Sequence, residues 1–168
     1  MRTKDESSFN RSRDCAEPCT WRLCNMAFWN RYQEDAGRPA ILPLAFLVLP
    51  LVLHRPTLEL IGSTRKASGL ALFAAKLGED RENLLAVHER ALALRWLTLQ
   101  SIAMGVSRQL LTLDYDAVTL RANAAVPNMR KPIVPERIRG LAGAAEKVGD
   151  WFAKVPLAQV ASTLAVEF

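Results

Sequence analysis

The sequence predicts a small, mainly α-helical protein with one β-hairpin, an α+β chain in which helices, then a hairpin, then helices follow one another. Hydrophobic residues make up 50% of the 168 positions, which is enough to form a real core. Apolar residues recur at helical spacing along most of the chain. The period changes to strict alternation only once, near residues 108–121. This order occurs in winged-helix units, and the alternative is an unclassified helical domain with a hairpin.

The polar first segment, residues 1–18, predicts a disordered arm, and residues 19–168 predict a single helical domain. Thr20 is the expected N-cap of the first helix, and Gly37 is its expected C-terminal turn. The arm has no apolar stretch that could act as a signal peptide. We therefore expect a cytoplasmic protein.

The most apolar segment runs from Ala40 to Leu53. It is apolar on every side, which is typical of a helix in the middle of a core. Pro43 suits its first turn, whereas Pro50 is expected to kink the helix or to end it early. The run is shorter than the roughly 20 residues that a membrane-spanning helix needs, so no membrane contact is expected.

The segments after this run predict five further helices. The third is the longest, capped by Asp80 and ending at Gly105, and prolines open the last two. The five are expected at residues 55–62, 67–77, 80–105, 135–155 and 156–164.

Between the third and fourth of these helices, Leu111 and Leu113 alternate with polar residues, as do Val118 and Leu120, with a turn at 114–117. In a winged-helix protein this hairpin would be the wing and the preceding helix the recognition element. The candidate nucleic-acid contacts would then be the basic residues of the hairpin and of the loop that follows it: Arg108, Arg121, Arg130 and Lys131. The preceding helix carries both Glu and Arg, so stand-alone winged-helix DNA binding is the alternative function.

Patterns that carry catalysis, cofactor binding or metal binding are absent from the sequence. There is no glycine-rich phosphate loop and no G-x-S-x-G nucleophile elbow. His54 is interpreted as a cap at a helix C-terminus and His88 as a core or flank residue. Cys15, Cys19 and Cys24 lack a fourth zinc ligand, so they are interpreted as free thiols. We expect no enzyme, no cofactor and no metal.

Aromatic residues suggest where a partner protein could bind. Trp151 and Phe152 are adjacent, so they cannot share one face of a helix, and one of them is expected to be exposed. We hypothesise that the tail helices, with Trp21 and Trp29 of the first helix, form a docking surface for a partner. The alternative is that both tail aromatics pack inside the subunit.

Two stretches resemble a known family. Residues 42–57 contain a proline start, an apolar run that ends in leucine-proline, and a histidine followed by a threonine three residues later. Residues 146–166 contain Lys147, Gly149, Trp151 and Phe152, followed by a short apolar helix. Both are similar to segments of the middle components of bacterial three-component ABC systems. The first helix departs from that family, because Asn25-Met26-Ala27 stands where asparagine-proline-alanine is usual.

The resemblance implies a function that the residue pattern alone does not give. It implies an accessory subunit that holds an SMC-like ABC ATPase and an effector protein together. The resemblance further implies that this complex acts in anti-phage or anti-plasmid defence of the Lamassu-like kind. Contact with DNA would then occur through the complex.

Overall fold

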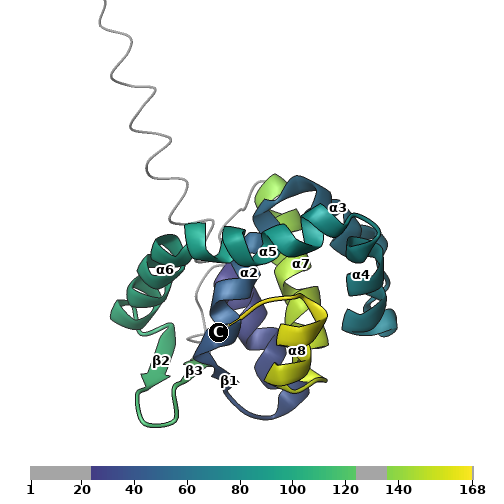
Figure 1. The fold of residues 1–168 in the computed structure, drawn as a ribbon. Coiled ribbons are helices and arrows are strands. Elements are labelled where there is room, and N and C mark those ends of the chain that lie inside the picture. Colours follow the sequence, from purple (N-terminus) through teal and green to yellow (C-terminus); the bar gives the residue numbers. More distant parts are fainter. Residues whose placement is uncertain (1–23, 124–135, 168) are drawn as a thin grey trace, which may run out of the picture.

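A computed structural model describes residues 24–123 and 136–167 (Figure 1). A first helix covers residues 24–36. The later helices are α2 (Ala45–Leu53), α3 (Arg55–Ser63), α4 (Gly69–Gly78), α5 (Arg81–Ala93), α6 (Arg95–Ser107), α7 (Glu136–Ala153) and α8 (Leu157–Thr163). The strands are β1 (Ala40–Ile41), β2 (Leu111–Asp114) and β3 (Thr119–Ala122). The predicted class, mainly helical with a small β element, is confirmed. The predicted arm at residues 1–18 and the loop with Arg130 and Lys131 lie outside the described residues.

Helix α2 lies in the middle of the fold and contacts α3, α5, α6 and α7 (Figure 1). Leu47, Val48 and Leu49 on successive faces of α2 are all buried, so the prediction of a buried central helix is confirmed. Pro50 lies inside α2 without ending it, and the helix continues to Leu53. Neighbouring helices on every side support the turn in which Pro50 cannot donate a backbone hydrogen bond.

The start of the apolar run differs from the prediction. Ala40 and Ile41 form strand β1, and residues Leu42–Leu44 form a 3-10 turn (η1) before α2 begins. Strand β1 pairs antiparallel with β3, with Ala40 opposite Leu120, and gives a three-stranded sheet of order β1-β3-β2. A two-residue strand carries no alternation of its own, which is why the pattern was interpreted as helix throughout.

None of the helices among the described residues is both long and apolar enough to cross a bilayer by itself. The pair formed by Leu42–Leu53 and Arg55–Ser63 meets the length and composition requirements jointly, but the two helices are bent by 95°.

The predicted long helix from Asp80 to Gly105 is in fact two helices. The chain breaks at Leu94, whose φ of −93° and ψ of 3° leave the helical region. Helix α5 packs against α2 and α4, whereas α6 turns away to contact β2. The break contains neither glycine nor proline, so tertiary packing sets it rather than local sequence. The predicted cap is confirmed, because the backbone N–H of Asn83 donates to Asp80 Oδ1 at 3.2 Å.

Candidate partner-binding surface

The aromatic residues that were expected to form the docking surface lie inside the subunit. Trp29, Trp151 and Phe152 are all fully buried, and Trp21 lies outside the described residues. The expectation of an exposed aromatic in the tail was therefore wrong. Trp151 and Phe152 do point to different sides of α7, as adjacent helical residues must, but another helix packs against each of these two sides. Phe152 meets Phe28 of the first helix at 5.9 Å between ring centroids, and Trp151 stacks on Phe73 of α4 at 5.2 Å.

The tail segment that carries the family resemblance holds several elements together. The indole Nε1 of Trp151 donates to the backbone oxygen of Lys66 at 2.9 Å. The Lys147 amino group donates to the carbonyl oxygens of Ile61 at 2.7 Å and Thr64 at 2.9 Å. It thereby caps the C-terminal end of α3, where the helix leaves carbonyl groups unpaired. Burial lowers the pKa of Lys147 below its ordinary value. Lys147 thus belongs to the internal structure rather than to a solvated basic face.

Asp150 is a buried carboxylate within this segment. Its oxygens lie 2.7 Å from Lys154 Nζ, 3.0 Å from Lys66 Nζ and 3.4 Å from an Arg31 guanidinium nitrogen. Burial alone would raise the pKa of Asp150, but the hydrogen bonds from Lys154 and Lys66 outweigh it and hold the pKa well below its usual range. Asp150 thereby joins α7 to the first helix and to the 3-10 turn η2 (Lys66–Ser68).

Gly149 allows α7 to approach the first helix closely. A Cβ atom at this position would lie 2.7 Å from the backbone oxygen of Phe28, which is nearer than real Cβ atoms come to such an atom. Any side chain would therefore push the two helices apart. Lys147, Gly149, Asp150 and Trp151 together act as a structural clasp.

The histidine in the first resembling stretch also has a structural setting. His54 is the N-cap of α3, and its Nδ1 lies 2.8 Å from the hydroxyl oxygen of the buried Thr57. Arg90 donates to the same hydroxyl at 3.3 Å. Burial, followed by the nearby Arg90 charge, lowers the pKa of His54. The prediction that His54 caps a helix C-terminus is confirmed, because it is also the C-cap of α2. Its charged form, however, is disfavoured by these surroundings.

Groups that could perform chemistry are not gathered in the described residues. Among them, no three His, Cys, Asp or Glu side chains lie close enough together to hold a metal ion. Burial raises the pKa of the Cys24 thiol to about 12, so this thiol is protonated at neutral pH and is a poor nucleophile. Half-buried His88 accepts a backbone hydrogen bond from Glu167 at its Nδ1.

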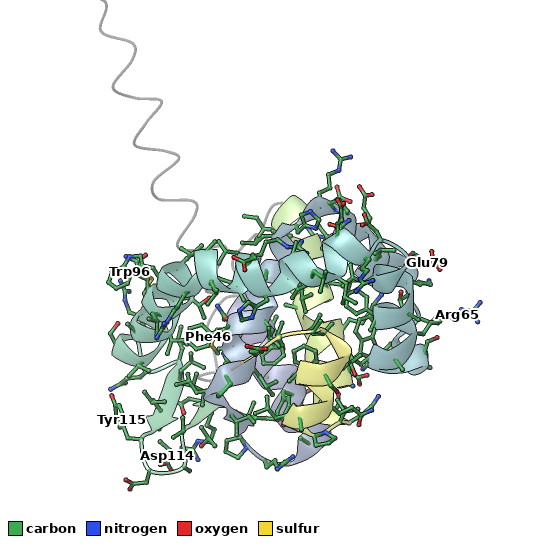
Figure 2. All side chains as sticks on the ribbon, in the orientation of Figure 1. Phe46, Arg65, Glu79, Trp96, Asp114 and Tyr115 are labelled. Carbon is green, nitrogen blue, oxygen red and sulfur yellow. The ribbon has the colours of Figure 1, made fainter. Side chains whose placement is uncertain are left out.

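The surface has an apolar stripe that the sequence did not single out. Four large side chains on the outer faces of α5 and α6 are exposed: Leu85 (53%), Leu92 (53%), Trp96 (70%) and Leu99 (38%). Leu85 and Leu92 lie at helical spacing on α5, Trp96 and Leu99 do so on α6, and Figure 2 shows Trp96 on the outer side of α6. We call these four residues the α5–α6 stripe. The sequence pattern did not predict this stripe, because both faces of these helices carry leucines and the sequence alone does not show which face is buried.

A hollow of about 280 Å³ adjoins the stripe at Leu92. Its walls are mostly apolar and come from α2, α5 and the C-terminal segment, through residues such as Phe46, Leu47 and Val166. Arg95 lies on its rim and forms no ion pair within the described part of the chain. The stripe and the hollow together make one uncovered apolar region of the kind that marks protein–protein contacts.

The hairpin forms a second exposed feature, separate in sequence from the stripe. Tyr115 at its tip is 81% exposed, and Val118 is 47% exposed. The exposed carboxylates of Asp114 and Asp116 stand on either side of Tyr115 in sequence. Arg108 and Arg121, the candidate phosphate contacts, are also exposed, but Arg108 is the C-cap of α6 and Arg121 lies within β3, so neither is in the turn. The tip of the hairpin is therefore anionic.

The described residues thus define a small helical protein with an internal clasp and an uncovered apolar surface, as expected of a component of a larger assembly. A family model described as ABC-three component (ABC-3C) system Middle Component 3 matches residues 23–168, and the chain belongs to this family. It is therefore a middle component of a three-component ABC system. Neither curated proteins nor solved structures gave a match.

Proposed function

We propose that this chain is a non-catalytic accessory subunit that holds an SMC-like ABC ATPase and an effector protein together. The assembly would act inside the cell in defence against phages or plasmids. DNA would be contacted through the complex rather than by this subunit alone. The family gives the setting, a system of three components, and the other two components are the natural partners.

The α5–α6 stripe is the observation that carries the binding role. A helix that packs only on one side normally presents polar residues to water on the other. Here Leu92 and Trp96 occupy the outward positions instead. Burying side chains of this size against a partner would contribute about 25 cal/mol for each Å² of apolar surface removed from water. Tryptophan at the centre of an interface is also among the residues whose loss costs most binding energy.

The experiment is co-expression of the chain with the other two components of its system, followed by purification through a tag on this chain. Leu92→Asp with Trp96→Asp places two charges on the stripe and should reduce recovery of at least one component roughly tenfold. Because both residues are exposed, the circular dichroism and thermal midpoint of the double variant should stay close to those of the parent.

Leu72 provides a matched control. It is 43% exposed but lies on α4, away from the stripe. Leu72→Asp should leave recovery of both components unchanged. Equal recovery with the parent and with the double stripe variant would refute the stripe as the docking surface.

A further inference from the structure

The hairpin tip has features that neither the clasp nor the stripe explains. The turn between β2 and β3 projects from the body of the protein, and Figure 2 shows Tyr115 and Asp114 at its end, away from the helices. Tyr115 is the most exposed large hydrophobic side chain of the described residues. A tyrosine exposed to water at the end of a projecting turn lacks the packing contacts through which aromatic residues usually stabilise a protein.

The turn is also held in one conformation. Asp114 Oδ1 accepts hydrogen bonds from the backbone N–H groups of Asp116 and Ala117, each at 3.0 Å. The carbonyl oxygen of Val118 accepts from the backbone N–H of Leu42 at 2.9 Å. Tyr115 is therefore presented from a fixed support, and ordering the loop would cost little on binding.

Val118 has a φ of +51°, a left-handed conformation that β-branched residues rarely adopt. Glycine or asparagine would fill this position without strain. Val118 is thus an apolar, exposed and strained residue in the same turn as the exposed tyrosine. Such strain concentrates where a local shape serves binding.

The charge of the hairpin tip limits the kinds of partner surface that it can bind. Asp114 and Asp116 flank Tyr115, and neither carboxylate forms an ion pair with any described residue. Phosphate groups would be repelled by this tip, so a nucleic-acid backbone fits poorly. A protein surface with lysine or arginine around an apolar depression complements both the ring and the carboxylates.

We propose that Tyr115 inserts into an apolar pocket, rimmed by lysine or arginine, on another component of the system. The hairpin would then be a second docking element beside the α5–α6 stripe, and two separate surfaces are what a bridging subunit requires. This inference rests on the proposed function, because it takes the partner to be one of the other two components.

The test measures the affinity of the purified full chain for each of the other two components, in low and in high salt. Tyr115→Ala should weaken binding to one component by roughly tenfold or more. Asp116→Lys should weaken the same interaction and reduce its salt dependence, because a favourable charge contact has been removed. Both positions are exposed, so folding should be unaffected. Glu79→Lys, a charge reversal at an exposed residue far from the tip in Figure 2, should bind like the parent.

Several results would overturn the inference. Parent-like affinity of both hairpin variants for both components would do so, even if the stripe variant fails to bind and the proposed function stands. If the parent chain binds neither component, both the proposed function and this inference are refuted. Binding of duplex DNA by the parent that is lost in Tyr115→Ala would assign the tip to nucleic acid. A dimer of the isolated chain that Tyr115→Ala dissociates would assign it to a second copy.

Discussion

The amino group of Lys66 lies 3.0 Å from the buried carboxylate of Asp150, a contact that joins the 3-10 turn η2 to the last third of α7 across 84 residues of sequence. Two further cations reach the same carboxylate: Lys154, which directly follows α7, and Arg31 of the first helix. Removing Asp150 would therefore take this partner from Lys66 and Lys154, whereas Arg31 would keep its ion pairs with Asp35 at 2.9 Å and Glu34 at 3.1 Å.

Asp150→Asn should lower the free energy of unfolding by about 2 kcal/mol. The carboxylate is buried, but Lys66 and Lys154 are about half exposed, so solvent screening reduces the loss below that of a fully buried pair. Urea unfolding at neutral pH measures the change. Glu59→Gln breaks the exposed pair with Arg55 and should change stability by less than about 0.5 kcal/mol. Equal effects of the two substitutions would contradict the assigned role of Asp150.

The stabilising effect of Asp150 should depend on pH. Its pKa is lower in the folded chain than in the unfolded chain, so the unfolded chain takes up the proton first as the pH falls. The contribution is fully present above the unfolded pKa of about 4 and is lost as the pH falls toward the folded value. Asp35, whose pKa is raised chiefly by burial, acts in the opposite direction. The stability difference between parent and Asp150→Asn, measured from neutral pH to about pH 3, should therefore shrink.

Gly149→Ala should destabilise the protein by about 1–3 kcal/mol, because the new methyl group would meet the backbone oxygen of Phe28. Gly143 lies on the same helix with open space around its Cβ position. Gly143→Ala should leave stability unchanged or raise it by up to about 1 kcal/mol, since alanine favours helix. Thermal unfolding of both variants decides the matter, and a neutral Gly149→Ala would show that α7 and the first helix can separate freely.

Val118→Gly should stabilise the chain by about 1 kcal/mol, because glycine adopts the left-handed conformation without strain. Thr119→Gly, at the next position but within β3, should destabilise it, because glycine weakens strands. Urea midpoints give both values. A destabilised Val118→Gly would mean that the valine side chain contributes packing that outweighs its backbone strain.

The isolated chain should bind duplex DNA only weakly at physiological salt. The hairpin tip carries Asp114 and Asp116, whose charges oppose those of Arg121 in β3 and Arg108 at the end of α6. Fluorescence anisotropy with a labelled duplex at several salt concentrations is the measurement. Sub-micromolar affinity with a steep salt dependence would favour the winged-helix DNA-binding alternative.

Local sequence signals predicted the elements whose ends are marked by caps and turns. Asp80 starts α5, Gly37 follows the first helix in a left-handed conformation, and Pro156 precedes α8. The hairpin was predicted because alternation needs only one exposed face. The break at Leu94 was not predicted, since it depends on how α6 packs against β2 and not on the residue itself.

The expectation of an exposed aromatic in the tail failed for a related reason. Trp151 and Phe152 were expected to compete for a single covered face, but α4 covers one side of α7 and the first helix covers the other. Sequence gives the direction of a side chain around its own helix and not the number of neighbours that surround that helix. Leu92 and Trp96 were overlooked because the same periodicity that predicts a buried face cannot tell which face is left uncovered.

The pairing of β3 with β1 has a mechanical consequence. Strand β1 leads through η1 directly into α2, and the hydrogen bond from Leu42 to Val118 adds a second tie at the same place. A force applied to the hairpin tip would therefore be transmitted through β1 and η1 to the central helix α2, and not to a flexible hinge. The hairpin is thus coupled directly to the core. A displacement of Tyr115 by a bound partner would be transmitted first to the N-terminal turn of α2.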